Sequence, residues 1–148
     1  MAKLLLINGP NLNRLGKREP HKYGSTTLPE LERDLARTAQ ESSFELQCFQ
    51  SNFEGAIIDA LHEAEDEGVR GIILNPGAYT HYSYAIRDAI AGISVPVIEV
   101  HITNVHAREE FRHVSVTAPV TRGQIVGLGM HGYHLALEAL IRLIEGEG

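Results

Sequence analysis

The chain has 148 residues and a mass of 16.3 kDa, the size of a single domain. Its 13 Lys and Arg against 19 Asp and Glu give a net charge of −6, which argues against nucleic acids and anionic membranes as partners. The single cysteine, Cys48, excludes an internal disulfide and fits a reducing compartment. The apolar run 4–7 is too short for a membrane span or a secretory signal, so we expect a cytoplasmic protein.

The first half of the chain predicts two strands and two helices. In chain order, these elements and their connection are a buried strand over 3–8, a polar loop over 11–25, a helix carrying Leu28, Leu31, Leu35 and Ala39, a partly exposed strand over 44–50, and a helix from Phe53 to about Gly68. Either Thr26 or Thr27 is expected to cap the first helix at its N-terminus.

The second half predicts three more strands. In chain order, its elements are a strand over 71–75, a helix over 82–91, a strand over 97–100, a short helix over 104–112, a strand over 124–128 and a final helix carrying Leu137, Leu140, Ile141 and Ile144. The tail 145–148 is expected to be disordered. Continuous apolar strands that alternate with helices predict a parallel sheet covered on both faces. We therefore expect one domain over 1–148 with an α/β, flavodoxin-like fold, a three-layer sandwich around a five-stranded parallel sheet.

Polar residues gather at the ends of three predicted strands. They are Asn8 and Asn11 after the first strand, Asn75, Tyr79 and His81 after the third, and Glu99, His101, Thr103 and Asn104 at and after the fourth. In sheets of this kind, ligands bind outside the carboxyl ends of the strands. Amides and imidazoles gain little from a place in the core, so these strand ends are the candidate binding site.

Glu99 and His101 carry the clearest chemical signal. They lie two residues apart in a predicted strand, so their side chains point to the same face of the sheet. A carboxylate beside an imidazole favours the imidazolium and fixes its orientation, which would make His101 a general acid near neutral pH. A histidine in a purely structural hydrogen bond is an equally good interpretation of the spacing alone.

Thr103 and two arginines surround the expected helix over 104–112. The backbone N–H groups at a helix start bind anions, but a plain N-cap role is the more common use of such a threonine. Arg108 and Arg112 lie four residues apart, so they would share one face of this helix and either bind a substrate or pair with neighbouring glutamates. No His or Cys spacing in the chain predicts a metal site.

The loop over about 12–25 is the other concentration of reactive groups. Its Tyr23 is a poor base unless a cation such as Arg18 favours the tyrosinate. A glycine-flanked loop of this length is typical of a lid that closes over a substrate, although a solvated loop with one exposed tyrosine fits the residues as well.

Three segments, at 7–24, 74–89 and 97–115, resemble the signature blocks of the type II 3-dehydroquinate dehydratases in order and spacing. Segment 123–137 is similar to the last strand and helix of that family, so the resemblance covers nearly the whole chain. It implies conversion of 3-dehydroquinate to 3-dehydroshikimate by trans elimination of water through an enolate, in the shikimate pathway or in quinate catabolism. It also implies no metal, no organic cofactor, and trimers that assemble into a homododecamer.

The resemblance assigns five residues to catalysis. It implies that Tyr23 abstracts the C2 proton of the substrate, with Arg18 favouring the tyrosinate. Asn11 would help to hold the enolate. His101 would protonate the departing C1 hydroxyl, and Glu99 would orient His101.

Six further residues are implied to bind the substrate. Asn75 and the backbone of Ile102 and Thr103 would hold the carboxylate, His81 and Arg112 would contact the ring hydroxyls, and Asp88 would come from the neighbouring subunit. An active site completed across an interface would make assembly a condition of catalysis.

Other functions also occur on a flavodoxin-like fold. A receiver-type signalling domain needs acidic residues after the first strand, where this chain has Asn8 and Asn11, and a flavin or nucleotide binder rests on fold analogy alone. The dehydratases that use a lysine Schiff base need an amine in a desolvated pocket. The three lysines here, Lys3, Lys17 and Lys22, lie at a strand start and in the predicted loop.

Overall fold

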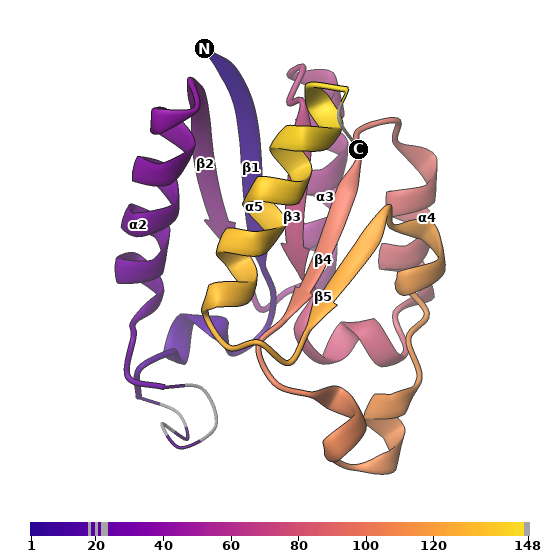
Figure 1. The fold of residues 1–148 in the computed structure, drawn as a ribbon. Coiled ribbons are helices and arrows are strands. Elements are labelled where there is room, and N and C mark those ends of the chain that lie inside the picture. The colour runs from indigo at the N-terminus through magenta and orange to yellow at the C-terminus, as the bar shows by residue number, and fades with distance from the viewer. Residues whose placement is uncertain (18, 20, 22–23, 147–148) are drawn as a thin grey trace.

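The computed structural model describes residues 1–17, 19, 21 and 24–146. Five parallel strands form one sheet in the order β2-β1-β3-β4-β5 (Figure 1). The strands are β1 (Ala2–Asn8), β2 (Phe44–Gln50), β3 (Gly71–Asn75), β4 (Val97–His101) and β5 (Gly123–Val126). This order is that of flavodoxin-like doubly wound sheets, so the predicted fold class is confirmed.

Helices cover both faces of the sheet, as the continuous apolar strands predicted. On one face lie α2 (Leu28–Glu41) and α5 (His131–Ile144), and on the other lie α3 (Glu54–Asp66) and α4 (Tyr84–Gly92) (Figure 1). Successive side chains of β1 alternate between the two cores: Leu4 and Leu6 face α2 and α5, whereas Leu5 and Ile7 face α3 and α4. The strand ends are therefore held rigidly from both sides.

Thr27, not Thr26, caps α2. Its hydroxyl accepts a hydrogen bond from the backbone N–H of Glu30, and the Glu30 carboxylate accepts one from the backbone N–H of Thr27. This reciprocal capping box satisfies two N–H groups that the first helical turn leaves without partners. It fixes the point at which the chain leaves the loop over 12–25 and enters the helix.

The predicted helix over 104–112 is wrong. The chain forms two 3-10 turns instead, η3 (Val105–Ala107) and η4 (Glu110–His113). The Asn104 side chain accepts a hydrogen bond from the His106 N–H, and Arg108 between the turns is extended, with φ −120° and ψ −162°. An extended residue cannot continue the helical hydrogen bonds, so no α-helix forms and Thr103 caps none.

Several boundaries differ from the expected ones by a few residues. Strand β4 runs one residue further, to His101, and β5 ends at Val126 because Gly127 turns the chain with φ 87°. In the tail, for which we expected disorder, Glu145 and Gly146 close the last turn of α5 by donating backbone hydrogen bonds into the helix. Residues 147 and 148 lie outside the described part of the chain.

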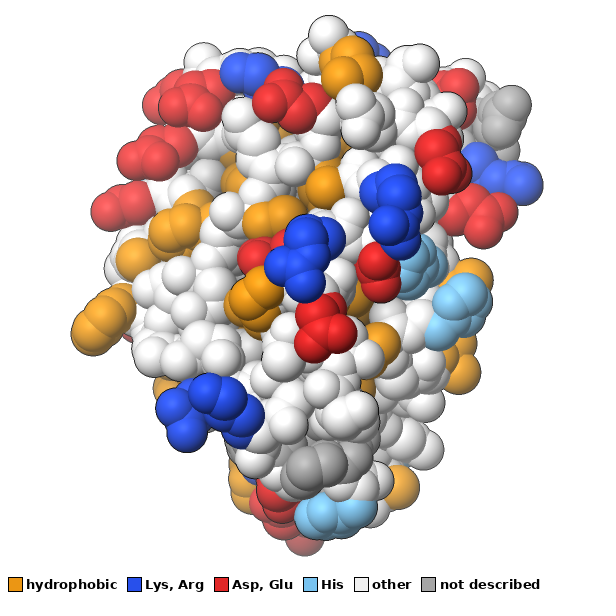
Figure 2. All heavy atoms as spheres, turned by 90° about the vertical axis from the view of Figure 1, so that its left-hand side faces the viewer, with side chains coloured by type: hydrophobic (Ala, Val, Ile, Leu, Met, Phe, Trp, Pro, Cys, Tyr) orange, Lys and Arg blue, Asp and Glu red, His pale blue; other side chains and the backbone are white. Residues whose placement is uncertain are grey.

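Charged side chains are spread over the face that α2 and β2 form. Figure 2 shows basic groups scattered among acidic ones on this face rather than gathered into one patch. Among the described residues, no helix is long and apolar enough to cross a membrane.

Candidate active site

The ends of β1, β3 and β4 surround a cavity of about 150 Å³. Seven of the residues predicted to form the site line it: Asn11, Asn75, His81, His101, Ile102, Thr103 and Arg112. These residues come from four separate segments of the sequence, which the parallel sheet brings to one edge. These predicted residues therefore meet at the carboxyl ends of the parallel strands, where ligands bind in sheets of this kind.

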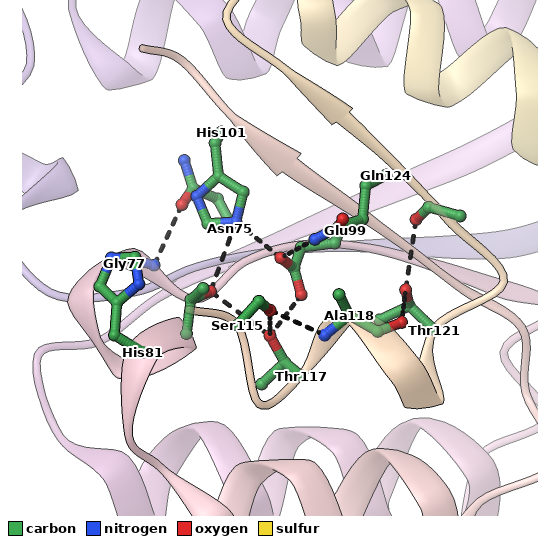
Figure 3. A network of polar contacts seen from close by, with 12 residues as sticks. Asn75, Gly77, His81, Glu99, His101, Ser115, Thr117, Ala118, Thr121 and Gln124 are labelled. Carbon is green, nitrogen blue, oxygen red and sulfur yellow. Dashed lines mark hydrogen bonds and ion pairs between the residues drawn. The ribbon is translucent and has the colours of Figure 1, made fainter. Parts of the chain in front are cut away.

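Glu99 and His101 form a buried pair, as their spacing predicted. His101 Nε2 lies 2.6 Å from Glu99 Oε2, and the two residues are 7% and 0% exposed (Figure 3). A carboxylate can only accept, so Nε2 carries the hydrogen and Nδ1 is the ring nitrogen left for another partner. His101 also lines a second cavity, of about 140 Å³, together with His106 and His113.

Two further side chains hold the Glu99 carboxylate, and neither of them could be selected from the sequence pattern. The hydroxyl of Thr117, which is fully buried, donates to Glu99 Oε1 at 2.5 Å, and Gln124 Nε2 donates to Oε2 at 2.6 Å (Figure 3). Gln124 is the register partner of Glu99 on β5, a pairing that knowledge of the sheet order would have revealed. Thr117 lies in an irregular segment, for which no periodicity signals a contact.

His81 presents a defined hydrogen-bonding face. Its Nδ1 lies 2.8 Å from the carbonyl oxygen of Val114, so Nδ1 is the donor and Nε2 is the acceptor of the neutral ring. Partial burial lowers the pKa of His81, and the positive charge of Arg112 acts in the same direction. The ring is therefore held in its neutral form, with Nε2 available to accept from a hydroxyl.

The Asn75 side chain is 3% exposed and is held by the turn that follows β3. The Gly77 backbone N–H donates to its Oδ1 at 3.0 Å (Figure 3). This contact fixes which end of the amide faces the backbone, because an N–H can bond only to the amide oxygen.

Asn11 has a left-handed backbone conformation, with φ 71°. Its N–H donates to Asn52 Oδ1 at 3.0 Å, and Gln50 Nε2 donates to the same oxygen at 3.2 Å. Asparagine tolerates this conformation better than most residues. Gln50 ends β2 and Asn52 follows it. Both residues support the site, and neither was predicted from the sequence.

The two arginines are not arranged as the helix prediction required. Arg108 donates from Nη1 to Thr103 Oγ1 at 3.1 Å, whereas Arg112 donates from Nε to Glu109 Oε1 at 3.0 Å. The hydrogen bond from Arg112 lowers the pKa of Glu109 to about 2. Both arginines line the cavity, so the site contains guanidinium groups in a chain of net charge −6.

Two of the predicted site residues that the structure describes, Glu99 and Asp88, do not line the cavity. The Asp88 side chain is 80% exposed on α4 and is not among the residues that line the cavity. Arg18 and Tyr23, which we expected to supply the base and its activating cation, lie outside the described residues. Among the described residues, no three His, Cys, Asp or Glu side chains form a cluster that could hold a metal ion.

This arrangement can bind a small polar anion and transfer a proton to it. An oriented imidazole, amide groups, a neutral histidine and two guanidinium groups surround one cavity at the switch point of a doubly wound sheet. Such a set defines an α/β enzyme that uses general acid–base catalysis.

Comparison with known proteins identifies the family. The family model described as dehydroquinase class II matches residues 2–141, and the chain belongs to this family. A 3-dehydroquinate dehydratase of Anoxybacillus flavithermus is 65% identical over 148 residues, which are 100% of this chain and 99% of that protein. A 3-dehydroquinate dehydratase of Bacillus mycoides is 69% identical over 145 residues, covering 98% of this chain and 99% of its own. The resemblance identified from the sequence segments is confirmed.

Solved structures agree with this assignment. The type II dehydroquinase of Butyrivibrio crossotus superposes with a TM-score of 0.92 at 55% identity, covering 95% of this chain and 97% of that one. The type II dehydroquinase of Propionibacterium acnes gives a TM-score of 0.91 at 43% identity, covering 95% and 96% of the two chains.

Proposed function

We propose that the chain dehydrates 3-dehydroquinate to 3-dehydroshikimate, as a step of the shikimate pathway or of quinate breakdown. Its family, and the names of relatives that match over their whole length, support this activity. The observation that carries the mechanism is the buried Glu99–His101 pair at the wall of a cavity lined by polar groups.

The reaction needs one proton removed and one supplied. Tyr23, activated by Arg18, takes the proton from C2, and the electron pair of that bond forms an enolate with the neighbouring ketone. The enolate then re-forms the ketone and expels the C1 hydroxyl, which leaves as water after it takes a proton from His101. Because Glu99 engages Nε2, Nδ1 is the nitrogen that delivers this proton.

Fixed dipoles stabilise the enolate better than water does, because they are oriented before charge develops. Asn11 fills this role, since its backbone is already held by Asn52. For substrate binding, Asn75 and the backbone of Ile102 and Thr103 take the carboxylate. The cavity wall that these three share supports this assignment.

His81 and Arg112 bind the ring hydroxyls of the substrate. The neutral His81 ring offers Nε2 as an acceptor, whereas Arg112 is a donor oriented by Glu109, so the two groups suit opposite ends of one hydrogen-bonded hydroxyl. None of these steps requires a metal or an organic cofactor.

The proposal includes an assembly of twelve subunits, built from trimers in which Asp88 reaches the active site of a neighbour. The exposure of Asp88 and its place away from the cavity of its own chain fit such a role. The cytoplasmic location expected from the sequence remains a prediction.

An ultraviolet assay tests the proposed reaction. The product contains a ketone conjugated to a double bond, so adding 3-dehydroquinate to the purified protein should produce rising absorbance. A protein that leaves the substrate unchanged would overturn the proposal.

A trapping experiment tests the route. Borohydride added with the substrate should leave no covalent adduct, because an enolate mechanism forms no imine. A lysine trapped by reduction would refute the enolate mechanism even if the dehydration were observed.

A further inference from the structure

Tyr133 is a buried titratable residue that the proposed mechanism does not use. It lies in the first turn of α5 and is 0% exposed, yet its hydroxyl reaches the ends of two strands. Asn75 Nδ2 lies 2.8 Å from the Tyr133 oxygen, and Asn8 Oδ1 lies 2.6 Å from it. Tyr133 therefore connects the helix layer to a residue that lines the active-site cavity.

The direction of every hydrogen bond in this chain of contacts is determined. The Gly77 N–H requires the oxygen of Asn75, so the Asn75 Nδ2 group must face Tyr133 and donate to its oxygen. The Tyr133 hydroxyl has one hydrogen, and that hydrogen is then donated to Asn8. The sequence of donors and acceptors runs from the Gly77 backbone through Asn75 and Tyr133 to Asn8.

Burial reinforces this order. It raises the pKa of the Tyr133 phenol well above its ordinary value, so the hydroxyl keeps its hydrogen at any pH at which the enzyme works. A tyrosine oxygen that donates to Asn8 has only its lone pairs left for Asn75, and it accepts one Nδ2 hydrogen. Among the described residues, only the Tyr133 oxygen accepts from Asn75 Nδ2, so the second Nδ2 hydrogen is available to a ligand in the cavity.

We propose that Tyr133 is a positioning residue that, together with the Gly77 N–H at the other end of the amide, holds Asn75 in place, so that Asn75 offers the substrate carboxylate an N–H donor rather than a carbonyl oxygen. A flipped amide would turn its oxygen toward an anion and repel it. The inference rests on the proposed function, because the role of Asn75 toward a carboxylate comes from there.

Tyr133→Phe tests the inference by removing the hydroxyl alone. A weakened hydrogen bond to a charged group should raise KM for 3-dehydroquinate about tenfold, with kcat within about twofold of the parent value. A hydroxyl that only supported the fold would give a lower melting temperature and a smaller active fraction, with KM unchanged. An unchanged KM in the folded variant overturns the proposal.

A double-mutant cycle with Asn75→Ala shows whether Tyr133 acts through Asn75. In the Asn75→Ala background, adding Tyr133→Phe should change KM by less than about twofold, because the group to be oriented is already absent. If the KM increases of the two single variants multiply in full in the double variant, the proposal is overturned. If the parent protein shows no turnover at all, the proposed function has failed instead, and the two failures are distinguishable.

Asn8→Ala provides an independent variant in case Tyr133→Phe does not fold. Without the Asn8 acceptor, the Tyr133 hydrogen is free to turn toward Asn75 and to compete with the Nδ2 donor there. KM should rise at least about threefold, less than for loss of the hydroxyl itself. An unchanged KM in the folded Asn8→Ala variant contradicts the inferred hydrogen-bond order.

Discussion

His101 depends on its neighbours for the orientation in which it can donate a proton. The Glu99 carboxylate, fully buried, is held by three donors, from His101, Thr117 and Gln124. These donors hold the carboxylate in one place, and the carboxylate in turn orients the imidazole through Nε2. The acid–base chemistry therefore belongs to a set of side chains rather than to the histidine alone.

We predict that His101→Ala lowers kcat at least about 10²-fold while the fold persists, because a general acid typically contributes 10²–10⁴-fold. The measurement is the initial rate of dehydration at saturating substrate, with circular dichroism to confirm the fold. His62→Ala is the matched control, since His62 is an exposed residue of α3 and does not line the cavity. Near-normal turnover in His101→Ala would remove this residue from the mechanism.

Thr117 offers a second test at the scale of one hydroxyl. Thr117→Val keeps the shape but removes the donor to Glu99, so we expect a loss of about 1.5–3 kcal/mol in the free energy of unfolding and a fall in kcat of at least about threefold. Thr117→Ser keeps the hydroxyl and should retain most of the parent stability and most of the parent kcat. Urea unfolding and steady-state kinetics measure the two effects, and equal values for the Val and Ser variants would show that the hydroxyl is irrelevant.

The site residues differ in how far the sequence could reveal them. Glu99 and His101 were predictable because side chains two apart in a strand share a face. Thr117 and Gln124 were not, because each reaches Glu99 through folding contacts 18 and 25 residues apart in the chain. Local spacing carries information about neighbours in one element, and it carries none about partners brought together by the sheet.

The loops after β1 and β3 meet closely at Gly9. The Gly9 N–H donates to the Asn75 carbonyl at 2.8 Å, and a Cβ placed on Gly9 would lie 2.8 Å from the carbonyl oxygen of Pro76. The contact is with backbone, so a larger residue must push the two loops apart. Asn11 lies in the loop after β1, and Asn75 ends β3 at the start of the other loop. A residue larger than glycine at position 9 would therefore displace both site residues.

We therefore predict that Gly9→Ala destabilises the protein by about 1–3 kcal/mol and lowers kcat/KM, because the overpacked loops displace the groups that face the cavity. Gly55→Ala is the matched control, since a Cβ there meets nothing within 4 Å. Its free energy of unfolding should stay within about 1 kcal/mol of the parent value. The two variants are compared by urea unfolding and by kinetics, and equal behaviour would contradict the steric argument.

Elements were predictable in proportion to how regular their patterns are. The strands β2 and β3 have the predicted bounds because their apolar patterns stop abruptly at polar or turn residues. The segment 104–112 contains good helix formers but folds as two 3-10 turns, since Asn104 caps a single turn and Arg108 is extended. Local polar contacts, such as the hydrogen bond from Arg108 to Thr103 five residues earlier, prevail there over helix propensity.

At the scale of the whole molecule, the net charge does not describe the groups that line the cavity. The chain carries −6, yet the cavity wall contains Arg108 and Arg112 and would receive an anionic substrate. Net charge describes the average surface, whereas binding depends on groups within a Debye length of about 8–10 Å. The acidic balance therefore remains an argument about macromolecular partners and says little about the substrate.

The proposed assembly makes a prediction that a self-sufficient subunit cannot satisfy. If Asp88 serves the site of a neighbour, then Asp88→Ala subunits keep an intact His101, and His101→Ala subunits can donate an intact Asp88. Each variant alone should be weakly active. Mixed oligomers, formed by co-expression at equal amounts, should recover about a quarter of the parent activity, because random pairing in a symmetric ring makes that fraction of sites complete.

Co-expressing His101→Ala with Glu99→Ala is the control. Each subunit supplies both of these residues to its own site, so no pairing of the two variants yields a complete site. The solution mass of the parent, measured by light scattering, should be about twelve times the 16.3 kDa of one chain. Absence of recovery in mixed oligomers of that mass would show that each subunit uses only its own residues. Recovery in a monomeric preparation would be inconsistent with a shared site, because complementation requires subunits in contact.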